Sequence, residues 1–372
     1  MTANISRRLL LAGSAAALGG ATLGVPARSA LGQPAISAGS GGLIRLIANE
    51  NAYGPSPAAR EALSASIDDC WKYAFRASTG LKTLIAEREG VDREQIMIGA
   101  GSAEILRIAA LVFGLGGGEV IAARPTFNLL PTYAATIGCV VREVPLDDEM
   151  RHDLDGMASA IGAASRLMYV CNPNNPTGTR VEGEVLRAFL SEVAGKIPVL
   201  VDEAYLDLSD DLREHTAVPR VLAGDRVIVT RTFSKLHGLA GLRIGYSIAS
   251  PEITQQLEAH RMTVLNLPGL RAATASYTDL EFQRLSRAQI QKGMSIATEV
   301  FDELGRPYVP SYGNFVFFDT GGSPEDFSAA MRRQGIMTGL SFAPYETWAR
   351  VSMGTVEHMQ MFARAAREYF QA

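Results

Sequence analysis

Two kinds of apolar pattern alternate along most of the chain. Short runs that are apolar at nearly every position recur between segments whose apolar residues follow the helical period. Unbroken apolar runs are typical of strands that are covered on both faces, as in a parallel sheet with helices on either side. We therefore predict strands at Glu94–Ile98, Glu119–Ala122, Cys139–Val144, Leu167–Val170, Pro198–Val201, Arg226–Thr230 and Arg243–Ser247.

Helices are predicted between many of these strands, including Ser102–Val112, Thr126–Ile137 and Glu182–Ala194. Alternating strands and helices favour an α/β fold with a mostly parallel central sheet. After about Leu265 the pattern changes to a long helical stretch, Leu267–Leu304, followed by an alternating strand at Asn314–Asp319 and another helix. This part of the chain is predicted to form a second, smaller α+β domain.

The N-terminus does not fit this alternation. Arg7 and Arg8 precede an apolar run that continues to about Val25 and is interrupted by glycines. A charged start, an apolar stretch and small residues after it are typical of an export signal, and paired arginines resemble a twin-arginine signal. The run is apolar on every face, which argues against an amphipathic first helix. We expect a periplasmic or exported protein, or a cytoplasmic one if the signal is not used.

These patterns predict a division of the chain. We expect an export signal at 1–32, a Ser/Gly-rich linker at 33–42, an N-terminal arm with part of the small domain at 43–72, the larger domain at 73–264 and the C-terminal small domain at 265–372.

The formal net charge is −4, but the first 40 residues hold three arginines and no acid, so the remainder carries −7. The charge pattern does not favour a nucleic-acid partner.

Cysteine and histidine usage argues against a metal centre. The three cysteines, Cys70, Cys139 and Cys171, show no CxxC spacing, and the five histidines are scattered. A disulfide framework and a zinc site are therefore not expected.

Four segments carry polar residues in an unusual order, and three of them follow or end predicted strands. CNPNNPTG at 171–178 follows one strand, and VLVDEAY at 199–205 ends another in Asp202, with Tyr205 three residues later. RTFSK at 231–235 places Lys235 beside hydroxyl side chains, and GLAGLRIGY at 238–246 holds Arg243. Ligands of open α/β sheets bind at the carboxyl ends of strands. Each segment alone is also compatible with an ordinary turn or a solvated strand end, but together they predict one site.

The residue types at this site suit a phosphorylated aldehyde. Thr232 and Ser234 can hydrogen-bond a phosphate, Arg243 can pair with it bidentately, and Lys235 can form a Schiff base with an aldehyde. With NPNNPTG, DEAY and RTFSK…GLAGLRIGY in this order, the sequence resembles the pyridoxal phosphate (PLP)-dependent aminotransferases of fold type I, class I/II, from about Leu43 to the C-terminus. Within them it is similar to the histidinol-phosphate aminotransferase subgroup.

The resemblance implies a fold and a set of cofactor contacts. The fold would be the fold type I PLP-dependent transferase fold, with a larger α/β domain and a smaller α+β domain. Lys235 would hold PLP as a Schiff base and act as general acid and base, while Asp202 would keep the pyridine nitrogen protonated. Asn175 and Tyr205 would hydrogen-bond the ring hydroxyl. The remaining implied contacts are Thr232, Ser234, Arg243 and the Gly101-Ser102-Ala103 backbone for the phosphate, and Phe127 for stacking on the ring.

Two of these positions depart from the family pattern. Ala103 stands where members commonly have an aspartate, so only its backbone carries over, and Phe127 stands where a tyrosine is usual. A phenyl ring still stacks but lacks the hydroxyl. Tyr73 matches a tyrosine that reaches the phosphate in the neighbouring subunit, which implies a homodimer with shared active sites.

The substrate is less well determined. The resemblance places Tyr53, Asn175, Asn314 and Arg350 in the substrate pocket, with Arg350 binding the α-carboxylate. Gly339 aligns with a position that is usually arginine in histidinol-phosphate enzymes. Losing that charge-assisted contact to a phosphate would cost about 1.5–3 kcal/mol.

We therefore expect transamination between a carboxylate-bearing amino acid and a 2-oxo acid. The aromatic residues Tyr53, Phe127 and Trp348 suggest an aromatic amino acid. The export signal also argues against histidinol phosphate, because histidine synthesis is intracellular.

Other functions remain open at this point. One is a histidinol-phosphate aminotransferase, and another is a PLP-dependent amino-acid decarboxylase or lyase, which Arg350 disfavours because it would hold the carboxylate that a decarboxylase releases. A non-enzymatic reading, a periplasmic solute-binding protein, fits the length and the signal but does not explain Lys235 and Arg243.

Overall fold

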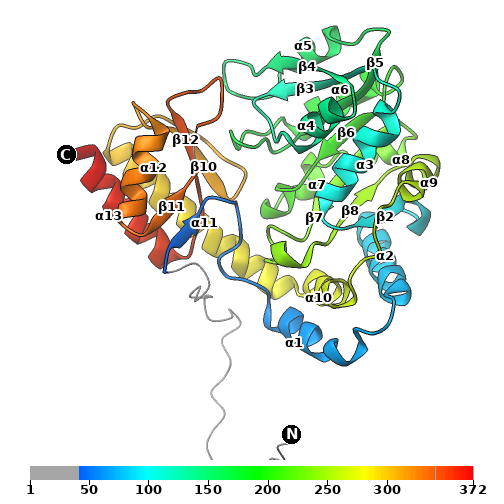
Figure 1. Cartoon of the computed structure of the whole chain (residues 1–372), viewed down its shortest axis with the longest axis horizontal. Helices are drawn as coiled ribbons and strands as arrows, with labels where there is room; N and C mark the ends of the chain where they lie inside the picture. The colour runs from blue at the N-terminus through cyan, green and yellow to red at the C-terminus, as the bar shows by residue number, and fades with distance from the viewer. Residues whose placement is uncertain (1–41, 340, 372) are drawn as a thin grey trace, which may run out of the picture.

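The structure is a computed structural model that describes residues 42–339 and 341–371. The predicted export signal, and all of the predicted linker except Gly42, lie outside the described residues. The chain forms a larger part built around a central sheet and a smaller part that contains the last three helices, drawn in yellow to red in Figure 1.

The central sheet has seven strands in the order β2-β8-β7-β6-β5-β3-β4. Strand β8 runs antiparallel to both of its neighbours, and β3 to β7 run parallel to one another. The strands are β2 Ile96–Gly99, β3 Glu119–Arg124, β4 Val140–Pro145, β5 Ser165–Cys171, β6 Val199–Asp202, β7 Val227–Thr232 and β8 Gly245–Ile248. All seven predicted strands are found here, and the mostly parallel α/β fold predicted from the sequence is confirmed.

The unbroken apolar runs are explained by burial on both faces. In β5, Met168 and Val170 belong to the apolar cluster on one face of the sheet, whereas Leu167, Tyr169 and Cys171 belong to the cluster on the other face. Successive side chains of a strand point to opposite faces, so both must be apolar. Burying each such side chain contributes roughly 1.5–3 kcal/mol.

Helices cover both faces of this sheet (Figure 1). The helices of the larger part are α1 Pro57–Ala65, α2 Phe75–Glu89, α3 Ser102–Gly114, α4 Leu129–Thr136, α5 Leu154–Ser159, α6 Gly183–Val193, α7 Leu212–His215, α8 Val218–Leu222, α9 Pro251–Ala259 and α10 Leu267–Thr278.

Two predicted helices differ in extent from those observed. Helix α4 begins at Leu129, three residues later than predicted, because residues 126–128 form a loop over the sheet edge. The long helical stretch is two helices, α10 and α11 Leu280–Glu303, separated at Asp279. The Asp279 side chain accepts a hydrogen bond from the Phe282 backbone N–H and caps α11.

The smaller part contains α11, α12 Pro324–Arg333 and α13 Val356–Gln371 around two small sheets. Strands β9 Tyr308–Val309, β10 Phe315–Asp319 and β12 Trp348–Ser352 form an antiparallel sheet, and β1 Ile44–Leu46 pairs in parallel with β11 Ile336–Thr338. The N-terminal arm therefore joins the smaller part through β1 and then crosses to the larger part, where α1 packs against α10. Within the described ranges, no helix is long and apolar enough to cross a membrane.

Candidate active site

The sheet topology brings four of the predicted segments to one edge. Cys171, Asp202 and Thr230 are direct neighbours across β5, β6 and β7, at the carboxyl ends of these strands. A cavity of about 530 Å³ lies at this edge. The predicted site residues that line it are Ser102, Ala103, Phe127, Asn175, Asp202, Tyr205, Thr232, Ser234, Lys235, Arg243 and Arg350.

Asp202 is a buried carboxylate held by two hydroxyl groups. The Thr230 hydroxyl donates to Oδ1 at 2.9 Å, and the Tyr169 hydroxyl donates to Oδ2 at 3.3 Å. Burial raises the pKa of Asp202 to about 6, and these two hydrogen bonds oppose the rise. Lys235 also favours the ionised form. The carboxylate is thus fixed in orientation and ready to accept a cationic partner.

Lys235 follows β7 and extends its amine into the same cavity. Its Nζ donates to the backbone oxygen of Asn49 at 3.0 Å and lies 5.2 Å from the centre of the Tyr205 ring. Burial, followed by the charge of Arg350, lowers the pKa of Lys235 to about 8, although Glu50 and Asp202 favour its charged form. A substantial fraction of the amine is therefore neutral, and hence nucleophilic, near pH 8.

A group of donors lies at the start of α3. Nη1 of Arg243 donates to the Ser234 hydroxyl at 3.2 Å, and the Thr232 hydroxyl donates to the same oxygen at 3.0 Å. Arg243 adopts a left-handed backbone conformation with φ 55°, which a non-glycine residue rarely adopts without a functional reason.

Helix α3 begins beside this group, at Ser102. A side chain at Gly245 would collide with the Ser102 backbone nitrogen, so glycine there permits β8 to approach the helix start closely. Gly101 precedes the helix with φ 75°, and it lies against the Arg243 guanidinium. Backbone N–H groups of a first helical turn, with an arginine and two hydroxyl groups, form a site suited to a phosphate.

Tyr205 lies between the sheet edge and the N-terminal arm. Its hydroxyl accepts hydrogen bonds from Asn49 Nδ2 at 2.9 Å and from Asn175 Nδ2 at 3.2 Å. Burial raises the pKa of Tyr205. The hydroxyl is therefore a neutral donor to a ligand in the cavity.

Arg350 enters the cavity from β12 of the smaller part. It donates to Asn175 Oδ1 and, at 2.8 Å, to the backbone oxygen of Ile47, while its buried Nε has no hydrogen-bond partner among the described residues. Its Cζ lies 5.5 Å from the Phe315 ring centre and 5.1 Å from that of Phe342. A fixed guanidinium with a donor to spare is suited to a carboxylate.

Four predicted contact residues do not line the cavity: Gly101, which lies against the Arg243 guanidinium, Tyr53, Asn314 and Tyr73. The Tyr53 hydroxyl is buried, and it accepts from the Val356 backbone N–H at 3.1 Å. Asn314 donates to the backbone oxygen of Glu50 at 3.1 Å. Tyr73 is 76% exposed on the surface of the subunit.

Several residues at the cavity were not singled out from the sequence. Thr230 and Tyr169 contact Asp202, and the signal for Thr230 is its place opposite Asp202 once the strands are paired in parallel. Asn49 has φ 53° and contacts both Tyr205 and Lys235, whereas the sequence predicts only that its segment belongs to the N-terminal arm. Phe342 lines the cavity from the β11–β12 connection, and no local pattern indicates this.

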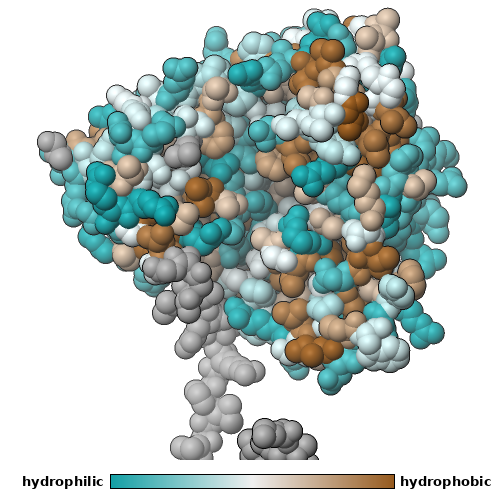
Figure 2. Space-filling view, in the orientation of Figure 1, coloured by the Kyte–Doolittle hydropathy of each residue, from teal (hydrophilic) through white to brown (hydrophobic). Residues whose placement is uncertain are grey.

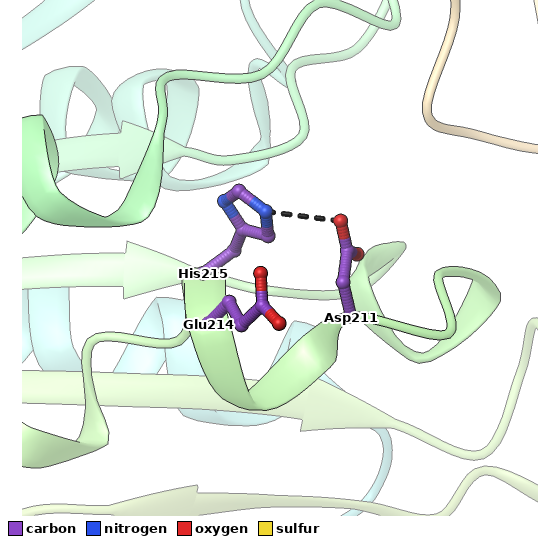
Figure 3. A group of neighbouring side chains, drawn as sticks. All are labelled: Asp211, Glu214 and His215. Atoms are coloured by element: carbon purple, nitrogen blue, oxygen red, sulfur yellow. Dashed lines mark hydrogen bonds and ion pairs between the residues drawn. The ribbon is translucent and has the colours of Figure 1, made fainter.

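One group of potential metal ligands lies elsewhere, at α7. Asp211, Glu214 and His215 have ligand atoms within 4.8 Å of one another (Figure 3). The His215 Nδ1 accepts from the Gly183 backbone N–H at 3.1 Å, and its Nε2 faces Asp211 at 3.0 Å, as the dashed line in Figure 3 marks. Asp211 also pairs with Arg180 at 3.1 Å. These contacts explain the cluster as one that ties α7 to the start of α6.

Comparison with known proteins identifies the family. The model of the family "Aminotransferase class I and II" matches residues 42–365. A histidinol-phosphate aminotransferase of Moorella thermoacetica is 38% identical over 330 residues, covering 88% of this chain and 85% of the relative. Histidinol-phosphate aminotransferase 2 of Ralstonia nicotianae is 37% identical, covering 85% of each chain.

A solved structure agrees with this result. The histidinol-phosphate aminotransferase of Sinorhizobium meliloti, in complex with pyridoxal-5'-phosphate, superposes with a TM-score of 0.82 at 28% identity, covering 88% of this chain and 91% of that one. The fold class, enzyme class and cofactor expected from the sequence are confirmed. The chain belongs to the class I and II aminotransferases and is a PLP-dependent aminotransferase.

Proposed function

We propose that Lys235 is the residue that binds PLP covalently and that Asp202 pairs with its ring nitrogen. The observation that carries this proposal is that Lys235, Asp202 and the Arg243–Ser234 pair line one cavity at the start of α3. The residues fit PLP because a phosphate site, a buried carboxylate and an amine with a lowered pKa occur together. Phe127, in the same wall, supplies an apolar face for the ring.

Each residue has a defined role in this proposal. PLP, when bound, supplies an electron sink that stabilises the charge left at the substrate Cα. Asp202 would hold a proton on the ring nitrogen, because its buried charge has no cationic partner in direct contact among the described residues. Lys235 would remove the proton from the substrate Cα as general base and deliver it, as general acid, to C4′ of the cofactor. Asn175 and Tyr205 hydrogen-bond the ring hydroxyl and fix its position.

We propose that the amino donor is an α-amino acid whose carboxylate pairs with Arg350. The support is the buried Nε, which has no hydrogen-bond partner in the described part of the chain, and the fixed orientation of the guanidinium. The Phe317 ring lies close to those of Phe342, Tyr345 and Trp348, at centroid distances of 5.9, 5.9 and 5.1 Å. These aromatic residues, one of which lines the cavity, favour a substrate with an apolar or aromatic side chain.

Histidinol phosphate is the second candidate donor, because the relatives above carry that name. The position of Gly339 argues against it. A Cβ at this position would lie 2.8 Å from the backbone oxygen of Arg350, so an arginine here would require the backbone to move. Position 339 therefore supplies no second guanidinium for a substrate phosphate.

We propose that the enzyme is a homodimer in which Tyr73 completes the site of the partner subunit. Ile67, Trp71, Tyr73 and Phe75 are exposed by 67–80%, next to α1 and α2. Figure 2 shows hydrophobic side chains over α1 and the segment after it, at the lower end of the view. Exposed apolar surface of this kind is typical of a subunit interface.

Mixing two inactive variants tests the shared site. A dimer of one Lys235→Ala and one Tyr73→Ala subunit has one site with both residues intact if Tyr73 acts across the interface. Random pairing then restores on the order of a quarter of wild-type activity. No restoration would show that Tyr73 acts within its own subunit, and a Tyr73→Ala protein that is active by itself would show that the site does not need Tyr73.

We propose that the chain is exported with residues 1–32 as a twin-arginine-like signal. The support is the sequence of that segment alone: paired arginines, an apolar run and small residues after it. Cell fractionation with the native N-terminus and with an Arg7→Lys/Arg8→Lys variant tests this. A wild-type protein found only in the cytoplasm with residues 1–30 intact would overturn it.

A donor screen tests the reaction and the substrate together. The PLP-loaded protein is mixed with one amino donor at a time and no acceptor, and the conversion of the cofactor to its amine form is followed by absorbance. We expect a larger kcat/KM for phenylalanine than for histidinol phosphate. The reverse order would favour histidinol phosphate as substrate, and release of carbon dioxide without a 2-oxo acid would indicate a decarboxylase.

A further inference from the structure

A second cavity of about 680 Å³ adjoins the candidate active site. Thr126, Asn128 and Phe342 line both cavities, so the two spaces adjoin at these residues. The outer cavity, which we call the outer groove, lies between the carboxyl ends of β3 and β4, helix α4 and the segment 341–343 of the smaller part.

Phe342, which lines both cavities, lies beside the residue where the substrate carboxylate is proposed to bind. The Phe342 ring centre lies 5.1 Å from Arg350 Cζ, and the ring meets Phe317 edge-on at 5.9 Å and 81°. A substrate held by its carboxylate at Arg350 and by its nitrogen near Lys235 has its Cα between these two groups. Its side chain then needs a separate space, and the outer groove is the adjoining one, because Phe342, next to Arg350, lines both cavities.

The chemistry of the walls limits which side chains fit. The walls are mostly small and apolar, with Ala122, Ala123, Pro131, Ala135 and Val141 among them. The charged residues that line the groove are Arg124 and Glu143, and they pair with each other at 2.5 Å. A phosphate would have to compete with the Glu143 carboxylate for Arg124. A flat apolar group would instead remove apolar wall surface from water.

We propose that the outer groove binds the side chain of the substrate amino acid and that Phe342 determines specificity for large apolar or aromatic side chains. This inference rests on the proposed function, because it takes the carboxylate to bind at Arg350. Small amino acids such as alanine would not reach the groove. Large apolar ones would bury their side chain against Phe342 and the alanines of β3 and α4.

Filling the groove tests this proposal. Ala135 is exposed on α4 in the groove wall, so Ala135→Trp adds bulk there without disturbing the core, and Thr136→Trp, exposed on the same helix outside the groove, is the matched control. The measurement is kcat/KM for phenylalanine and for alanine in the half-reaction. We expect Ala135→Trp and Phe342→Ala to lower the phenylalanine-to-alanine ratio by about tenfold or more, and Thr136→Trp to leave it unchanged.

A binding measurement separates failure of the groove from failure of the proposed function. Calorimetry of the PLP-loaded protein with 3-phenylpropionate and with propionate needs no turnover. We expect 3-phenylpropionate to bind about tenfold or more tightly than propionate, and Ala135→Trp to abolish the difference. Equal affinities, or a ratio that Ala135→Trp leaves unchanged in both assays, would overturn the groove proposal. Absence of turnover with any donor, with selective binding retained, would contradict the proposed function alone.

Discussion

Replacing Asp202 with asparagine is predicted to stabilise the PLP-free protein at neutral pH while weakening PLP binding. Asp202 is 1% exposed, and its pKa in the folded protein is raised from 3.8 to about 6, mainly by burial. The folded state therefore binds the proton more tightly than the unfolded chain does. This contribution to stability is fully present below pH 3.8 and is lost as the pH rises through about 6.

The size of the effect follows from the shift. About two pKa units at 1.36 kcal/mol each amount to about 3 kcal/mol of stability lost at pH 8 through burial of the ionised carboxylate. An asparagine does not ionise, and its side chain has the same shape and still faces the Thr230 and Tyr169 hydroxyls. The PLP-free Asp202→Asn protein is thus expected to exceed wild type by up to about 3 kcal/mol at pH 8 and by little at pH 4.

Urea unfolding of both proteins without PLP, at pH 4 and at pH 8, measures this difference. With PLP added, the order should reverse, because only the ionised carboxylate pairs with the protonated ring nitrogen. If the PLP-free wild-type protein is as stable as Asp202→Asn at pH 8, this would refute the claim that the ionised, buried Asp202 carboxylate destabilises the PLP-free fold.

Three further predictions follow from the same site and its surroundings. Because burial lowers the pKa of Lys235 to about 8, the rate of covalent PLP attachment should rise roughly tenfold per pH unit below pH 8 and level above it, as followed by absorbance; a rate that does not change between pH 6 and 8 would contradict this. Arg350→Gln should lower kcat/KM for amino acids by roughly 10–100-fold with unchanged PLP affinity, since it removes a charged contact; an equal loss of PLP affinity would place Arg350 at the cofactor instead. Arg231→Met leaves Glu89 and Glu203, which it contacts at 2.7 and 2.9 Å, buried without their cation, and should cost about 3–5 kcal/mol in a denaturation experiment; a loss below 1 kcal/mol would contradict this.

The central sheet could be predicted from the sequence because its strands are buried on both faces. Each unbroken apolar run, such as that of β6, indicates from the local sequence alone that both faces of the strand are buried. Lys235, Asp202 and Arg243 were also predictable, since each lies beside or at the end of such a run and belongs to a recognisable motif.

The rest of the site depends on contacts between distant segments. Thr230 reaches Asp202 only through the parallel register of β6 and β7. Asn49 reaches Lys235 because the N-terminal arm, 186 residues away in sequence, crosses the cavity with φ 53° at this residue. Phe342 lies in a connection of the smaller part, and its place opposite α4 follows from how the two parts pack. The local sequence around each of these residues does not indicate which distant segment it contacts.

The most direct test of the central claim is single-turnover formation of 2-oxo acid by the wild-type and Lys235→Ala proteins, each loaded with PLP and mixed with phenylalanine without an acceptor. We predict that wild type yields one equivalent of 2-oxo acid per subunit, with the cofactor recovered in its amine form. The Lys235→Ala protein should lose the covalent bond to PLP and nearly all of this conversion, because no other group is assigned to move the proton at the substrate Cα. Conversion at the wild-type rate by Lys235→Ala would contradict the assignment on which the account rests.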